Sequence, residues 1–303
     1  MSSDYLLFKD KSFKDELLSS WLTRLAHLNY INLKSFLGTY FPNKNYATKD
    51  IDLFLFDDYF YAKISSLTDI PIKNIKYLQL YKYQSYIEED ISNLARHHWV
   101  TPILHNIKKK NKFLAIRYCP HCLKEKAYFK SSWRIMFVNI CLKHKIYLLN
   151  KCPNCSSIIT YTKTNSNLEI YNCTNCNVDL RKSISKKVNI NSDEYFYQNF
   201  LSKIAQNGYY IYQNNCQYSM GLFYLLRILA RNIIKTDLKY ETKYLEEFEP
   251  RTVAKIIVDS MLLLENYPHN LKYFCKKTKL TNKPRFYDKY RYKKEYIPSW
   301  FSI

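Results

Sequence analysis

Glycine is almost absent from this chain, with three residues in 303. The Walker loop and the dinucleotide-binding loop both need several closely spaced glycines, so that the backbone can wrap a phosphate. Gly38, Gly208 and Gly221 are too far apart to form either loop. Nucleotide binding through a glycine-rich phosphate loop is therefore excluded.

The chain also lacks a long uninterrupted apolar run and a secretory leader. Its most apolar stretch, residues 220–234, contains Arg227 and Arg231 and is too short to span a bilayer. The N-terminus has no basic start followed by an apolar run and a small-residue cleavage site. We expect a soluble cytoplasmic protein with no membrane contact. Its cysteines should stay reduced, so Cys-x-x-Cys pairs favour metal sites over disulfides.

Acidic residues are scarce in two regions, and the net charge of the chain is +21. Residues 1–105 carry 12 basic and 12 acidic side chains, whereas residues 106–151 carry 12 basic and one acidic. Residues 271–303 carry 10 basic and two acidic. Because the first third is neutral, a general lysine bias does not explain the excess. Such concentrated charge favours a polyanionic partner, and a solvated face is the alternative.

Cysteine, in contrast, is well represented, and seven of the nine cysteines lie in four tetrads. Each tetrad offers two thiolate or imidazole ligands separated by two residues, and two such pairs complete a tetrahedral zinc ion. Eighteen residues separate the first two tetrads and seventeen separate the last two, which fits the spacing of zinc sites. The tetrads are CPHC at 119–122, CLKH at 141–144, CPNC at 152–155 and CTNC at 173–176.

The pairing of the tetrads follows from the segment between the last two. Its β-branched SIITYT, turn-forming TNSN and returning LEIY predict a hairpin. The hairpin favours one site with Cys152, Cys155, Cys173 and Cys176, and a second site with Cys119, Cys122, Cys141 and His144. Interleaved pairing of alternate tetrads remains open. His121 is expected to be a turn residue, and Cys216 and Cys275 are expected to be small buried side chains.

Both sites have four protein ligands, which leaves no open position for water or substrate. We therefore expect two structural Zn²⁺ ions and no catalytic one. Acidic residues that could serve a nuclease, such as Asp57, Asp58 and Glu88–Asp90, lack a clear metal-binding geometry and are interpreted as solvated charge. No enzymatic activity is expected.

Apolar residues at helical spacing predict helices before the tetrads. Ser12 is the expected cap of the first helix, and Asn32 is the expected cap of the second. Residues 53–80 predict two helices with a break near Pro71, a pattern that resembles a helix-turn-helix.

Helices are also predicted after the tetrads. The segment RKSISKKVNI is interpreted as a linker, after which Ser192 and Pro250 each begin a helix. The predicted fold is mainly α with small β elements. The predicted domains are an N-terminal helical domain at 1–112, tandem zinc modules at 113–184, and a C-terminal helical domain with a basic tail at 185–303.

Basic and aromatic residues are interleaved around the first tetrad, a combination that suits phosphate contact and base stacking. The aromatic residues Tyr128, Phe129 and Trp133 either stack on bases or cover the zinc module. The candidates for nucleic-acid contact are Lys108, Lys109, Lys110, Lys112, Lys124, Lys126, Lys130 and Arg134.

The zinc region resembles the TniQ/TnsD family of transposon target-selection proteins. The resemblance rests on RYCPHCLKEKAYFKSSWRIMFVNICLKHKIYLLNKCPNC, which includes the Trp133-Arg134 and Lys143-His144 pairs, and on C-x-x-C-x3-L-R at 173–181. DELLSSWLTRLAHLN near the start and MLLLENYP at 261–268 are also similar to that family.

The resemblance implies a non-catalytic adaptor in DNA transposition. Such an adaptor couples target recognition to a TnsC-like AAA+ ATPase regulator, which recruits the transposase. Recognition is by an RNA-guided CRISPR effector complex of the Cascade type or by attachment-site DNA, and some members act as homodimers. The alternative is a stand-alone sequence-specific DNA-binding zinc protein, either a TnsD-like site selector or a transcription regulator.

Overall fold

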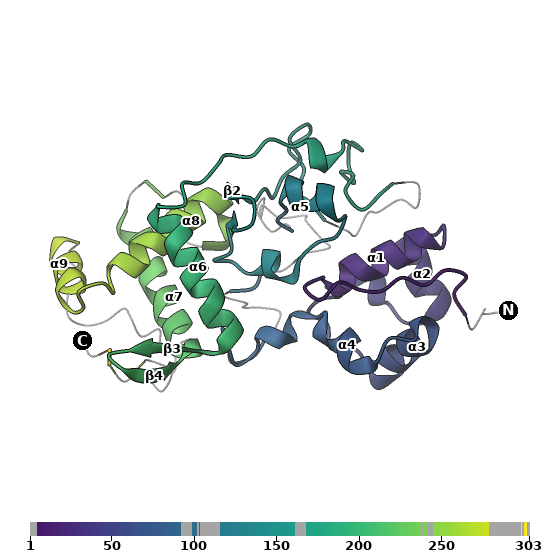
Figure 1. The fold of residues 1–303 in the computed structure, drawn as a ribbon, viewed down its shortest axis with the longest axis horizontal. Helices are drawn as coiled ribbons and strands as arrows, with labels where there is room; N and C mark the ends of the chain where they lie inside the picture. Colours follow the sequence, from purple (N-terminus) through teal and green to yellow (C-terminus); the bar gives the residue numbers. More distant parts are fainter. Residues whose placement is uncertain are drawn as a thin grey trace.

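The protein is mainly helical, with two small two-stranded antiparallel sheets, as predicted. Figure 1 shows the fold as a computed structural model. Among the described helices, none combines the length and the hydrophobicity that crossing a membrane requires. The structure describes residues 5–91, 99–101, 103, 116–160, 168–237, 239–240, 245–278, 298 and 300–301.

The N-terminal part contains short helices, two of which begin at capping side chains. Asn32 accepts a hydrogen bond from the backbone N–H of Ser35, as predicted, and Asp57 caps α3 in the same way. Asp69 adopts a left-handed conformation that ends α3, and α4 follows Pro71. The predicted pair of helices with a short turn is therefore present. The elements are α1 (Leu18–Leu28), α2 (Leu33–Tyr40), η1 (Tyr46–Thr48), α3 (Asp58–Thr68), α4 (Ile72–Tyr77) and η2 (Leu80–Tyr83).

The start of α1 differs from the prediction, because the helix begins at Leu18 and Ser12 does not cap it. The preceding residues pair with a distant segment instead. The N–H of Leu17 donates to the carbonyl of Phe129, and the N–H of Ser131 donates to the carbonyl of Asp15. This pairing keeps residues 15–17 extended, so tertiary contacts override the local capping pattern.

The middle of the chain combines short helical turns with a small sheet. Its elements are α5 (Pro120–Glu125), η3 (Ser131–Arg134), β1 (Ile140–Cys141), β2 (Ile146–Tyr147) and η4 (Leu180–Lys182). In the sheet, Ile140 pairs with Tyr147 and Cys141 pairs with Ile146. The segment predicted as a linker also joins β2, because the N–H of Tyr147 donates to the carbonyl of Lys186. The linker interpretation is therefore wrong for this stretch.

The C-terminal part follows the local sequence signals closely. Ser192 accepts a hydrogen bond from the N–H of Tyr195 at the start of α6, and Gly208, with φ 80°, ends this helix. Pro250 occupies the first turn of α8, as predicted. The elements are α6 (Asp193–Asn207), β3 (Tyr209–Tyr212), β4 (Asn215–Tyr218), α7 (Ser219–Thr236), η5 (Leu245–Glu247), α8 (Pro250–Leu262) and α9 (His269–Lys277).

One continuous hydrophobic core links these three parts. The indole N–H of Trp99 donates to the carbonyl of Phe223 at 3.0 Å, across 124 positions of the chain. Phe137 stacks on Phe223 with ring centroids 4.9 Å apart. The middle of the chain therefore packs against α7. The predicted domain boundary at residue 112 lies outside the described residues.

A buried ion cluster ties η3 to the N-terminal helices. The guanidinium of Arg134 is 0% exposed and donates to the carboxylates of Asp50 and Asp52 at 2.6–3.0 Å. Asp52 also accepts hydrogen bonds from the N–H and hydroxyl of Ser19 in α1. Arg134 was predicted to contact nucleic acid. That prediction is wrong, because its side chain is buried and its charge is matched by two aspartates.

Replacing Arg134 should destabilise the protein strongly. The R134M variant leaves Asp50 and Asp52 buried without a counter-charge, which should cost about 3–5 kcal/mol of unfolding free energy. Urea unfolding followed by circular dichroism measures this loss. The control is K124Q on the exposed surface of α5, which should stay within about 0.5 kcal/mol of the wild type. A loss below about 1 kcal/mol for R134M contradicts the structural role.

Candidate metal centres

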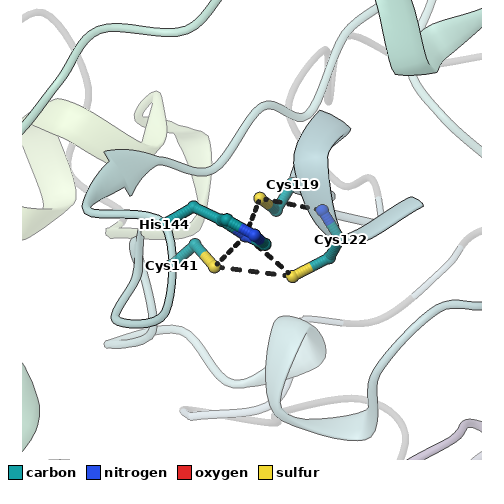
Figure 2. A group of neighbouring side chains, drawn as sticks. All are labelled: Cys119, Cys122, Cys141 and His144. Atoms are coloured by element: carbon teal, nitrogen blue, oxygen red, sulfur yellow. Dashed lines mark hydrogen bonds between the residues drawn. The ribbon is translucent and has the colours of Figure 1, made fainter. Parts of the chain in front are cut away.

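Four side chains converge at the first candidate centre, and they come from α5, β1 and the turn after it (Figure 2). Nδ1 of His144 lies 3.4 Å from Sγ of Cys119, 3.3 Å from Sγ of Cys122 and 3.5 Å from Sγ of Cys141. The sulfurs of Cys122 and Cys141 are 3.6 Å apart. Figure 2 shows the imidazole pointing in among the three sulfurs.

The second candidate centre consists of four cysteines. Sγ of Cys152 lies 3.5 Å from Sγ of Cys176, and Sγ of Cys155 lies 3.7 Å from Sγ of Cys173. The four ligand atoms of each centre lie within 4.8 Å of one another. The tetrads are therefore grouped sequentially and not interleaved. The hairpin predicted between the last two tetrads is not seen in the described residues, because Ile158 pairs with Lys151 and the N–H of Leu180 donates to the carbonyl of Tyr171. Its predicted turn, at 164–167, lies outside the described residues.

The donor distances fit one metal ion at each centre. An ion about 2.3 Å from each sulfur and about 2.0 Å from a nitrogen places tetrahedral sulfur pairs about 3.8 Å apart and sulfur–nitrogen pairs about 3.5 Å apart. The observed separations of 3.5–3.7 Å and 3.3–3.5 Å match these edges. Each set also supplies four ligands, so a tetrahedral ion would have no open position. Thiolate-rich donors of this kind suit Zn²⁺.

Three of the four tetrads form the same backbone turn. In each, the residue after the second ligand has a positive φ, and its N–H donates to the carbonyl of the first cysteine. The donors are Lys145, Ser156 and Asn177, with φ of 55°, 56° and 62°. The turn curls the backbone so that both ligand side chains of a tetrad face the same point.

The CPHC tetrad differs, because it forms the first turn of a helix. Cys119 is the N-cap of α5, and its sulfur accepts a hydrogen bond from the N–H of Cys122. Pro120 follows at the first helical position, where a missing N–H is tolerated. His121 therefore lies on a helix and not in a turn as predicted, and its ring centroid is 5.3 Å from that of His144.

Glu125 is a functional candidate that the sequence analysis missed. Oε1 of this carboxylate lies 3.0 Å from Nε2 of His144, and Oε2 forms a salt bridge with Lys143. The hydrogen bond from Lys143, and to a smaller extent the one from His144, lowers the pKa of Glu125. The carboxylate is therefore ionised and can only accept hydrogen bonds. An Nε2–H that donates to Glu125 leaves Nδ1 unprotonated and facing the sulfurs. The signal was available, since Glu125 lies three residues after Cys122.

The structure separates the predicted nucleic-acid contacts into different groups. Lys124 and Lys126 are exposed, and the Lys126 ammonium lies 5.1 Å from the Phe13 ring centroid. Lys130 forms a 2.9 Å salt bridge with Asp15, and Arg134 is buried as described above. Lys108, Lys109, Lys110 and Lys112 lie outside the described residues.

The aromatic residues near these lysines are core residues. Tyr128, Phe129 and Trp133 are all at least 92% buried, so they cover the zinc module and do not offer faces for base stacking. The two remaining cysteines also differ from one another. Cys275 is half-buried, whereas Cys216 is exposed on β4, and the prediction that Cys216 is buried is wrong.

With this geometry in place, the chain was compared with known protein families. Residues 7–148 match the family model TniQ. These residues therefore form a TniQ-like region that covers a little less than half of the chain. The matched region contains the N-terminal helices and the whole first centre, and it ends before Cys152, the first ligand of the second centre. A search of the curated proteins found no match to the chain.

The protein should retain two metal ions per chain after purification. Because each centre has its own four ligands, C141S and C173S should each lower the content to about one ion. Native mass spectrometry or elemental analysis measures the stoichiometry. C275S, which changes a cysteine outside both centres, should keep two ions. A wild-type content of one ion or none contradicts the ligand assignment.

Removing the Glu125 carboxylate should loosen the metal at the first centre only. In E125Q the ion should dissociate to a competing chelator about tenfold more readily, because a neutral amide orients the imidazole less firmly than a carboxylate and makes it a weaker ligand. A graded chelator titration should show this as a shift in one of two release steps. The matched control is E249Q, which removes a surface carboxylate that pairs with Lys151.

A third variant tests the cause of that shift. H144C supplies a sulfur ligand that needs no orienting partner, so adding E125Q to H144C should have no effect on release. An equal shift in E249Q, or an effect of E125Q that persists with H144C, overturns the positioning role.

Proposed function

We propose that this protein is a target-selection adaptor in DNA transposition. It would couple a target-recognition event, made by an RNA-guided CRISPR effector complex or by attachment-site DNA, to an AAA+ ATPase regulator that recruits the transposase. The TniQ match over residues 7–148 carries this proposal, because a TniQ region implies a role in transposition target selection.

The connection between the N-terminal helices and the first centre supports an adaptor. The helices and the metal module share the pairing of residues 15–17 with 129–131 and the ion cluster around Arg134. A partner bound on one part is thus held in fixed orientation relative to a partner bound on the other. Joining two partners needs this rigidity and does not need an active site.

We further propose that both centres hold Zn²⁺ as a structural ion. Each centre would use all four tetrahedral positions for protein ligands, and its metal-binding energy would contribute to folding, on the order of 10–16 kcal/mol per site. Cys119, Cys122, Cys141 and His144 would hold the first ion, and the four cysteines of the last two tetrads would hold the second. This role fits a non-catalytic protein.

The adaptor role predicts that targeted insertion depends on this protein. Deleting it should reduce insertion at the target site by at least a hundredfold in a cell that carries the transposase, the ATPase regulator and the recognition complex. Quantitative PCR across the insertion junction measures this. C141S should reproduce the loss, because it removes a ligand of the first centre, whereas C216S at an exposed cysteine should not.

The biochemical counterpart is a pull-down of the purified ATPase regulator. The protein should retain the regulator in the presence of ATP, and C141S should not. Insertion that is unchanged on deletion, together with a footprint of this protein alone on one duplex sequence, would instead establish a stand-alone DNA-binding regulator.

A further inference from the structure

Four exposed lysines lie beside the first metal centre, and three of them belong to the stretch where the sequence indicated a linker. They are Lys145, which follows His144, and Lys182, Lys186 and Lys187, which follow the second centre. We call these four residues the lysine edge. Lys182 ends η4, and the chain from there to α6, which carries Lys186 and Lys187, runs past β2 (Figure 1).

Backbone hydrogen bonds fix the lysine edge to the metal module. The N–H of Tyr147 donates to the carbonyl of Lys186 at 3.0 Å, and the N–H of Val188 donates to the carbonyl of Lys145 at 2.8 Å. Lys187 pairs with Ile146 across the same antiparallel bridge. Neighbouring strands lie about 5 Å apart, so Lys145 and the pair 186–187 are adjacent.

Two serines hold the segment further. The hydroxyl of Ser185 donates to the carbonyl of Tyr147 at 2.6 Å, and the hydroxyl of Ser183 lies 3.0 Å from that of Tyr118. An extended chain rises about 3.3 Å per residue, so Lys182 and Lys187 are at most about 17 Å apart. The four charges are therefore concentrated on an ordered stretch of surface.

Most of the charge of the lysine edge is not matched by acidic residues, although Lys182 helps Arg181 to lower the pKa of Asp179. Within the part of the chain that the structure describes, none of the four forms a salt bridge, whereas nearby cations do. Arg181 is paired with Asp179 and lies 3.5 Å from the ring centroid of Tyr171, and Lys151 is paired with Glu249. Cations gathered on an ordered stretch of backbone raise the local concentration of an anionic partner.

We propose that the lysine edge binds the phosphate backbone of a nucleic acid. A protein partner would need an apolar or aromatic anchor at the centre of its interface. Between Lys182 and Lys187 the only large apolar side chain is Ile184, which is 91% exposed. A polyanion needs only positive charge along its path. This inference rests on the proposed function and deepens it, because it assigns a surface that would contact nucleic acid. Arg134, which is buried, is not part of that surface.

The test uses the full-length chain and a triple variant, K182Q/K186Q/K187Q. Lys145 is left intact because it belongs to the turn that presents His144. The control, K34Q/K203Q/K272Q, removes the same charge from exposed positions on α2, α6 and α9. Fluorescence anisotropy should follow binding to a labelled 30-base-pair DNA duplex of arbitrary sequence and, separately, to an RNA hairpin, each over a range of salt concentrations.

We expect the triple variant to bind at least about tenfold more weakly than the wild type to one or both nucleic acids, and the control to bind within about twofold. For duplex DNA, the slope of log affinity against log salt should fall by up to about 2.7, or about 0.9 for each phosphate that the variant no longer neutralises. The duplex and hairpin arms decide which nucleic acid the lysine edge contacts. Both variants should keep two metal ions and the circular dichroism of the wild type.

Three outcomes overturn the proposal. These are no nucleic-acid binding by the wild type, unchanged affinity of the triple variant, and an equal loss in the control, which would mean that only net charge matters. A loss of binding to polyglutamate without a loss of binding to nucleic acid assigns the lysine edge to an acidic protein and also rejects it. The ATPase pull-down without nucleic acid is independent, because the triple variant should still retain the regulator. Failure of the adaptor role is therefore distinguishable from failure of the lysine edge.

Discussion

The middle of this protein depends on the convergence of eight ligand side chains into two tetrahedral sets. The elements around them are very short, with strands of two residues and helices of at most six. Such elements do not bury enough surface to stabilise themselves. A metal ion at each set would supply the missing stability, because bringing thiolates within about 4 Å without a cation is electrostatically unfavourable. The core residues that surround the first centre are then held where α7 and the N-terminal helices can pack against them.

The first centre is also where the parts of the chain are joined. Residues 129–131, shortly after α5, pair with residues 15–17, and the cluster of Arg134 with Asp50 and Asp52 lies next to this pairing. A buried ion cluster contributes little net stability compared with apolar packing. It does join residues far apart in the sequence, because moving any of the three groups away leaves a buried charge without its partner. An adaptor that presents two surfaces at once depends on connections of this kind.

The two centres have different surroundings. The first has three buried ligands and a half-buried histidine that is oriented by Glu125, and it lies inside the region that matches TniQ. The second has two half-buried sulfurs and lies beyond that region. Its two tetrads instead position the segment that ends in the lysine edge. The first centre thus organises the core, and the second organises a surface.

The sequence by itself determined the candidate metal ligands, the mainly helical fold and several helix starts, including those at Asn32, Ser192 and Pro250, and it favoured the sequential grouping of the tetrads. These features are mostly local, since a tetrad or a helix cap is formed by residues within a few positions of one another. Tertiary structure alone decided the start of α1, the burial of Arg134 and the pairing of residues 186–188 with β2. Each of these depends on contacts between distant segments, such as the hydrogen bond from Tyr128 to Asp15 across 113 positions. The sequence around a charged side chain is the same whether that side chain faces solvent or a buried aspartate. Only the fold determines which of the two it contacts.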